Sequence, residues 1–211
     1  ETGITASVLD RARQAGAIPK MVYTMTSTEY WTCSASLLHT DIGPEIGDVG
    51  LESNARLYFI AGAQHNSGFG LGRGIFQQCR NPLDHRPILR AAFLATDRWA
   101  TLGAEPPPSR YPTIAAGTLG TVTQYTARFP VIPGMALPAG NLQPRRLDLG
   151  PRFAGLGIAD AQPAVLGTPF PTRVPLPDMD GLDLDGVRLP AVAVPLGTYT
   201  GWNLRNPNVA G

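Results

Sequence analysis

Two stretches decide the fold of this chain: Met21-Val-Tyr-Thr-Met-Thr-Ser-Thr-Glu-Tyr-Trp31 and Arg56-Leu-Tyr-Phe-Ile-Ala-Gly-Ala-Gln-His65. The β-branched and aromatic residues at 21–24 and 56–61 are typical of buried strands. Each run ends where a loop with an ionisable side chain begins. The sequence therefore predicts two strands, each followed by a polar residue at its C-terminal end.

The segment between these strands predicts a helix. Ser27 or Thr28 is suited to cap its first turn, and apolar residues recur at helical spacing over 31–38. Glu29 and His65 would then both follow the C-terminal end of a strand. In open α/β sheets that edge carries ligands and chemistry, so we expect these two side chains to meet there.

Two further helices are indicated within the first hundred residues. The first 20 residues predict a short amphipathic helix, with Val8 and Leu9 on its apolar face. The strongest helical pattern covers residues 87–102, with Asp84 near its start and Gly103 as the residue that ends it. Its position suits the last helix of an α/β domain, packed against the sheet.

The chain changes character at about residue 104. Prolines recur every few residues from there on, which excludes long helices. Pieces with β-forming residues alternate with Pro-Gly and Asp-Gly turns, and short strands are expected at 120–125, 129–132 and 192–194. Several aromatic residues favour packing over disorder, because disordered segments usually lack them.

Composition excludes some classes of function. The net charge is +1 over 211 residues, which gives no electrostatic reason to expect a nucleic acid or an anionic membrane as partner. No apolar run reaches the length of a transmembrane helix, and no signal peptide is visible. The length is sufficient for a complete hydrophobic core.

The sequence allows more than one interpretation of the Asp-rich segment 178–186 and of the two cysteines. The Asp-rich segment 178–186 departs from the EF-hand pattern at its fifth and twelfth positions, so Asp-Gly turns in a hairpin explain it better than calcium binding. No set of residues has zinc-ligand spacing, and no metal site is predicted. Cys33 and Cys79 are either a disulfide, which would favour a periplasmic or extracellular location, or two unrelated thiols.

The order acid-then-histidine, each after a strand, resembles the last third of an α/β-hydrolase domain, where the chain order is Ser, Asp or Glu, His. The resemblance is more specific than this topology. The sequence is similar to a little-characterised bacterial family labelled simply "alpha/beta hydrolase domain" proteins, and it looks like the C-terminal portion of a member. The segments that carry the likeness are Thr26–Trp31, Ala61–His65, Asn81–Pro87, Pro107–Pro112, Leu147–Phe153 and Tyr199–Arg205.

This resemblance assigns roles to particular residues. It implies that His65 acts as general base and that Glu29 orients it, as in a nucleophilic triad. From residue types alone, a helix-dipole carboxylate and an ordinary loop histidine would be the preferred interpretation. Gln64, Asn66 and Trp31 are the weaker candidates for lining a substrate pocket. No cofactor is implied.

The nucleophile is missing from the predicted site. None of the seven serines stands in a Gly-x-Ser-x-Gly elbow, and Ser67 follows His65 in a loop without the required strand-to-helix turn. We therefore expect the serine to come from an N-terminal segment of the same protein or from a second polypeptide. The two strands and the helix at 87–102 should then leave an open strand edge and an apolar surface where that segment belongs.

Together these patterns predict an α/β fold in two parts. Residues 1–104 would be the C-terminal part of a parallel-sheet hydrolase core, and residues 105–211 a proline- and glycine-rich wrapping tail with short strands. The function implied is hydrolysis of a carboxylic ester or related acyl bond by a Ser-Glu-His mechanism. The alternative is a non-catalytic binding or structural subunit that reuses the hydrolase scaffold.

Overall fold

The computed structural model describes residues 9–43, 45–67 and 70–209. By the density of internal contacts the chain forms two compact units. One combines residues 1–19 with 143–171, and the other combines 20–142 with 172–211. This grouping places both sides of position 104 in the larger unit, so it cuts across the boundary expected from the sequence.

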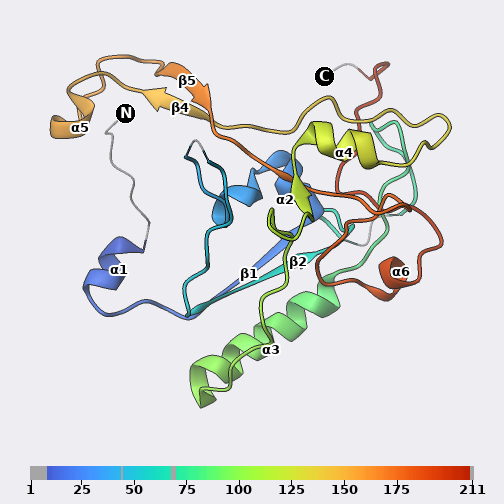
Figure 1. The fold of residues 1–211 in the computed structure, drawn as a ribbon, viewed down its shortest axis with the longest axis horizontal. Helices are drawn as coiled ribbons and strands as arrows, with labels where there is room; N and C mark the ends of the chain where they lie inside the picture. The colour runs from blue at the N-terminus through green and yellow to red at the C-terminus, as the bar shows by residue number, and fades with distance from the viewer. Residues whose placement is uncertain (1–8, 44, 68–69, 210–211) are drawn as a thin grey trace. The chain divides into compact units, whose positions relative to one another are not determined.

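The larger unit is built on a pair of parallel strands, β1 (Met21–Thr26) and β2 (Ala55–Ile60). They pair in register from Met21 opposite Ala55 to Thr26 opposite Ile60, and Figure 1 shows them side by side. The predicted strands and their mixed α/β setting are therefore confirmed, with β1 two residues longer than expected.

The two edges of this strand pair differ. The outer edge of β2 exchanges backbone hydrogen bonds with Arg110 and with Val187, which join it as isolated bridges. The outer edge of β1 has no strand partner among the described residues. An unpaired edge exposes a row of backbone donors and acceptors that can pair with another strand.

The helix after β1 is shorter than predicted. Helix α2 covers Ser27–Thr32, and Thr26, not Ser27 or Thr28, is its N-cap. Ser34 then takes a left-handed conformation with φ 57°, and a separate 3-10 turn, η1, covers Ala35–Leu38. The interruption follows from backbone geometry, since a left-handed residue cannot continue an α-helix.

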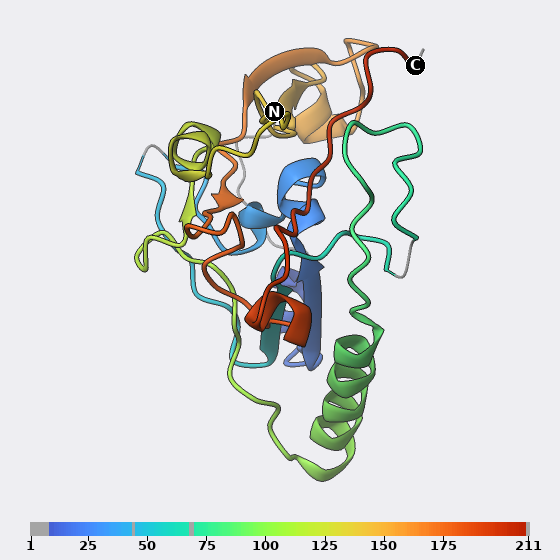
Figure 2. The same cartoon turned by 90° about the vertical axis from the view of Figure 1, so that its right-hand side faces the viewer.

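Helix α3 (Arg86–Leu102) agrees closely with its prediction, including the left-handed Gly103 that ends it. The N-cap is His85, while the carboxylate of Asp84 accepts the backbone N–H of Arg86. The helix contacts β1, as Figure 2 shows. Only Ala92 and Trp99 are buried, and Phe93 is 74% exposed. Much of its apolar side therefore remains uncovered by the described residues.

The segments expected as strands beyond residue 104 are in part helical. Helix α4 (Val122–Arg128) occupies most of the predicted 120–125 strand, because Thr121 and Gln124 form a capping box. Helix α6 (Pro190–Ala193) replaces the strand at 192–194, with Pro190 in its first turn. Residues 129–132 form no strand. Two short strands, β3 (Leu119–Gly120) and β6 (Val174–Pro175), pair antiparallel.

The core of this unit draws on both halves of the sequence. One buried cluster joins Tyr30, Phe59 and Ala61 to Leu182 and Val192. The other cluster is made by Trp31, Tyr125, Phe129, Val174, Leu176 and Trp202. Of the aromatic residues that favoured packing over disorder, Phe129 and Trp202 are buried in this core, and Tyr111 and Tyr199 pack against it partly buried.

The smaller unit contains two helices and a strand pair. Helix α1 (Asp10–Gln14) has no buried residue, and Val8 of its predicted apolar face lies outside the described residues. Strands β4 (Arg145–Asp148) and β5 (Val165–Pro169) pair antiparallel, with helix α5 (Phe153–Leu156) between them in sequence. The Arg146 guanidinium lies over the Phe170 ring at 4.8 Å, a favourable cation–π contact.

The buried His39 makes the larger unit sensitive to acid. Its side chain is hydrogen-bonded through Nε2 to the Tyr30 hydroxyl at 2.8 Å. Burial lowers the pKa of His39 to about 4, although the Asp48 carboxylate opposes this. In the unfolded chain a histidine titrates near its ordinary value of about 6.5. The unfolded state therefore takes up the proton first as the pH falls.

This difference predicts a loss of stability on acidification. Between pH 7.5 and 4.5, His39 should lower the free energy of unfolding by about 2–3 kcal/mol. His39→Gln removes the titrating group. Between pH 7.5 and 4.5, the unfolding free energy of this variant should therefore fall by about 2–3 kcal/mol less than that of the unsubstituted protein. Urea unfolding at the two pH values measures it. Equal pH dependence in both proteins would contradict the assignment.

Candidate active site

The start of α2 fixes the position of Glu29. Its Oε2 atom accepts the backbone N–H of Thr26 at 2.7 Å and also the Thr26 hydroxyl. These bonds close the capping box at the first turn of the helix. The side chain is only 14% exposed. Its second oxygen, Oε1, is directed to the loop that follows β2.

His65 lies on that loop and meets this second oxygen. Its Nδ1 atom is 2.5 Å from Oε1 of Glu29. The backbone N–H of His65 donates to the Thr28 hydroxyl at 3.2 Å, and that hydroxyl donates to the Gly201 carbonyl at 2.5 Å. The loop is therefore held to α2 through its backbone as well as through the imidazole ring.

The His65 ring is accessible on its other side. Its side chain is 68% exposed, and within the described ranges its Nε2 atom has no hydrogen-bond partner. A carboxylate that accepts from Nδ1 selects the tautomer in which Nε2 is the basic nitrogen. The arrangement is therefore competent to remove a proton from a group placed beside Nε2.

A second acidic residue, Asp183, joins the two strand ends. Its carboxylate accepts the backbone N–H of Gly62, just after β2, at 2.7 Å. It also accepts the hydroxyl of Ser27, the first residue of α2. Burial raises the pKa of Asp183 to about 6, against the opposing effect of these hydrogen bonds. Asp183 thus ties the helix that carries Glu29 to the loop that carries His65.

Sequence reasoning missed Asp183. In the sequence it stands among the Asp-rich turns at 178–186, the first of which closes a short antiparallel bridge between Pro177 and Asp183. Its neighbour Asp178 instead accepts two N–H groups of its own turn. Nothing in the residue pattern distinguishes Asp183 from the other aspartates of this segment, because its partners are over 100 residues away.

Asn81 constrains the same turn, and His85 lies near the Glu29–His65 pair. The Asn81 side-chain amide donates to the carbonyls of Gly62, at 2.5 Å, and Thr200, at 3.1 Å. His85, at the start of α3, is buried close enough to interact electrostatically with Glu29 and His65. Burial lowers the pKa of His85, which favours its neutral form beside the pair.

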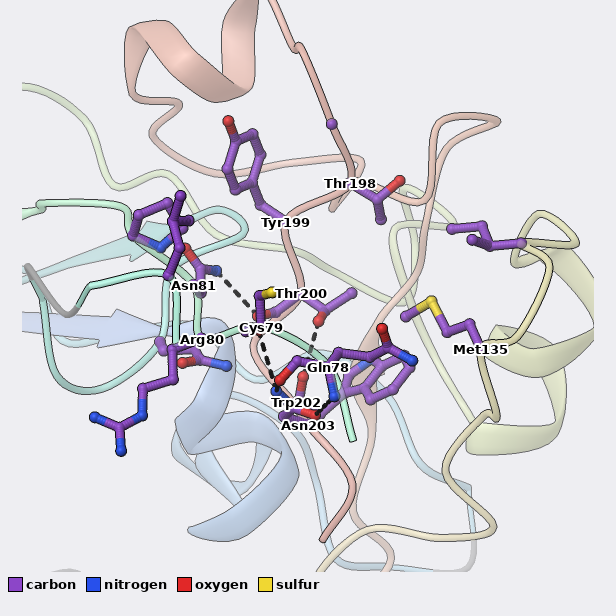
Figure 3. A pocket seen from close by; sticks show the side chains of 15 residues that line it. Gln78, Cys79, Arg80, Asn81, Met135, Thr198, Tyr199, Thr200, Trp202 and Asn203 are labelled. Carbon is purple, nitrogen blue, oxygen red and sulfur yellow. Dashed lines mark hydrogen bonds between the residues drawn. The ribbon is translucent and has the colours of Figure 1, made fainter. Parts of the chain in front are cut away.

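Two cavities adjoin the His65 loop. The first has a volume of about 420 Å³ and is drawn in Figure 3; the second, of about 480 Å³, is lined by His65 and Asn66. Gln64 lines both cavities. Trp31, in contrast, is 4% exposed and packs edge-on against Tyr125 in the core, so it lines neither cavity. The expectation for Trp31 is corrected.

Comparison with known proteins identifies the family. The sequence matches the family model described as "Alpha/beta hydrolase domain" over residues 4–211. The chain belongs to this family. The match covers nearly the whole chain, a broader finding than the expected likeness to a C-terminal portion. No curated protein and no solved structure matches the sequence.

The two cysteines of this hydrolase-family domain are free and exposed. Cys33 is the residue that follows α2, and Cys79 lies in the wall of the first cavity. The disulfide considered from the sequence is therefore absent from the structure, and with it the support for an oxidising compartment.

Three serines of the domain have hydrogen-bond partners other than His65. Ser27 donates to Asp183, Ser34 donates to the Leu142 carbonyl, and Ser109 accepts the Leu57 N–H. Among the described residues no serine hydroxyl is hydrogen-bonded to His65. The same residues contain no group of three or more His, Cys, Asp or Glu side chains able to hold a metal, and no helix suited to cross a bilayer.

Asp183→Ala should destabilise the hydrolase-family domain in a pH-dependent way. The variant leaves the Gly62 N–H and the Ser27 hydroxyl without their buried acceptor, a loss of about 2–4 kcal/mol. The folded pKa of about 6 exceeds the unfolded value of about 3.9. The pH-dependent part of the stabilisation from Asp183 is therefore fully present below about pH 4 and is lost as the pH rises through 6.

The cost of Asp183→Ala, measured by urea unfolding, should accordingly be about 1 kcal/mol larger at pH 5 than at pH 7.5. The exposed Asp180→Ala is the matched control from the same turn, and its effect should stay within about 0.5 kcal/mol at both pH values. A cost of Asp183→Ala that equals the control, or that grows with pH, would refute the role assigned to this carboxylate.

Proposed function

We propose that this domain supplies the acid and the histidine of a serine-type hydrolase acting on carboxylic esters or related acyl bonds. The observation that carries the proposal is the 2.5 Å contact between Glu29 and Nδ1 of His65, with the ring otherwise accessible. The pair stands at the C-terminal ends of parallel strands, the usual place for chemistry in α/β sheets. Family membership supports the same class of reaction.

Each residue has a defined step in this mechanism. Nε2 of His65 takes the proton from a serine hydroxyl as that oxygen attacks the acyl carbon, and then gives the proton to the leaving oxygen. Glu29 holds the ring in the required tautomer and stabilises the imidazolium that forms. Asp183 keeps the two strand ends in register through Gly62 and Ser27. No cofactor takes part.

The serine, we propose, is supplied by an N-terminal segment of the same protein or by a second polypeptide. Support comes from the outer edge of β1, which has no strand partner in the described part of the chain. Parallel sheets are normally extended and covered on both faces. The exposed Phe93 and Leu94 on α3 are apolar surface of the kind that such a segment would cover.

Fluorophosphonate labelling tests the proposal on protein purified from its native source. Intact-mass analysis and N-terminal sequencing show which segments accompany residues 1–211. Mass spectrometry of the labelled protein should then place the label on a serine outside these residues. His65→Gln should slow labelling by about 10²-fold or more, because the general base is lost.

The control for this experiment is Asn206→Gln, a change near the C-terminus and outside the site, which should leave the labelling rate unchanged. Labelling that does not depend on His65, or the absence of any labelled serine in the native protein, would contradict the hydrolase. The absence of any labelled serine would make a non-catalytic binding subunit the better explanation.

A further inference from the structure

The two cavities beside the His65 loop share part of their walls. Four residues line both of them: Gln64, Arg80, Trp202 and Asn203. Volumes of about 420 and 480 Å³ fall in the range of small-molecule sites. The cavity with His65 and the cavity drawn in Figure 3 are therefore adjacent compartments of one binding region.

Three of the four shared residues already bind other parts of the protein. The Asn203 amide donates to two backbone carbonyls, and its oxygen accepts a backbone N–H. The Trp202 indole N–H donates to the Tyr125 hydroxyl at 2.7 Å. Arg80 also has an interaction partner within the protein. Figure 3 shows the bonds of Asn203 inside the wall. These three side chains are thus held in place before any ligand binds.

The fourth shared residue, Gln64, is different. It stands directly before His65 on the loop after β2, and its side chain is only partly exposed. Within the described part of the chain its amide has no hydrogen-bond partner. A side-chain amide carries two donor hydrogens and an acceptor oxygen. Gln64 therefore presents free hydrogen-bonding groups at the boundary between the two compartments.

The other charged groups of the region favour an uncharged ligand. Among the described residues that line the two cavities there is no aspartate or glutamate, and Arg80 is the single lysine or arginine. Its partner within the protein means that it does not stand as an uncompensated cation. A charged ligand would lose its hydration here without gaining an ionic partner, which is costly.

Much of the remaining wall of the first compartment is apolar. Ile132 and Met135, from the segment after α4, line it and pack against the cluster that contains Trp202. Several polar side chains of the two walls are already engaged, since four threonine hydroxyls donate to backbone carbonyls: those of Thr28, Thr32, Thr198 and Thr200. A ligand in this compartment would therefore gain chiefly from burying an apolar body.

We propose that Gln64 determines ligand specificity in this region: its side-chain amide donates a hydrogen bond to a carbonyl oxygen of an uncharged ligand whose apolar body lies in the first compartment. Binding of such a ligand does not require catalysis. Where it rests on the proposed function, the inference also specifies the substrate class. The substrate would be an uncharged ester with an apolar acyl or alcohol part, its carbonyl group at the boundary where Gln64 lies.

Acetophenone and α-methylstyrene form a matched pair of probes, because they have the same shape and differ in a C=O against a C=CH₂ group. Cys79 lies in the wall of the first cavity and is exposed. Protection of Cys79 from alkylation by N-ethylmaleimide, followed by mass spectrometry of its peptide, measures the binding of each probe. The quantity compared between proteins is the ratio of the two half-protecting concentrations, so the different hydrophobicities of the probes cancel.

Gln64→Met retains the length of the side chain and removes its donor. The ratio should shift about tenfold in favour of α-methylstyrene, because the carbonyl of acetophenone then loses its hydrogen bond in the cavity. Gln64→Glu retains the shape without the N–H donor and should shift the ratio in the same direction. Gln143→Met is the control, an exposed glutamine outside both linings, and should leave the ratio unchanged.

Benzoate tests the preference for an uncharged ligand. It matches acetophenone in shape and carries a full negative charge, so its half-protecting concentration should be at least about tenfold higher.

A ratio that is unchanged in Gln64→Met, benzoate that protects better than acetophenone, or no protection by either neutral probe would each overturn the proposal. These experiments need no serine and no turnover, so their outcome is separate from that of the fluorophosphonate labelling.

Discussion

The two carboxylate oxygens of Glu29 bind different partners, and the geometry of the site depends on both contacts. Oε2 closes the first turn of α2 by accepting the backbone and side chain of Thr26, and Oε1 meets Nδ1 of His65. A carboxylate held at N3 of a helix has little freedom to rotate, so the imidazole is oriented by the same interaction that starts the helix. The carboxylate that caps helix α2 therefore also sets the orientation of the His65 ring.

The second half of the sequence completes this arrangement. Asp183 binds the turn after β2 and the first residue of α2, and Thr28 reaches the Gly201 carbonyl. Gly201 packs so closely on Ser27 that a Cβ atom would lie 2.3 Å from the Ser27 Cβ. Only glycine fits at such an approach. The proline-rich region is thus part of the scaffold that positions the acid and the histidine.

The sequence predicted the elements whose signals are local. Strand composition identified β1 and β2, helical spacing and Gly103 identified α3, and the strand ends identified Glu29 and His65. The errors have physical causes as well. Ser34 interrupts a pattern that otherwise looks helical, and the capping box at Thr121 overrides β-forming residues. Asp183 and the cavity wall depend on contacts between distant segments, which residue patterns do not encode. Trp31 was misplaced because helical spacing does not decide which buried face meets a cavity and which meets the core.

The central claim is that Glu29 fixes the tautomer of His65, and nitrogen-15 NMR of the imidazole ring tests it most directly. In the unsubstituted protein above the titration range, the His65 proton should reside on Nδ1, with Nε2 unprotonated. Glu29→Gln should shift the population towards the Nε2–H form that predominates in free imidazole side chains, while the exposed Glu45→Gln leaves it unchanged. A His65 proton on Nε2 in the unsubstituted protein, or a tautomer ratio indifferent to Glu29→Gln, would contradict the account.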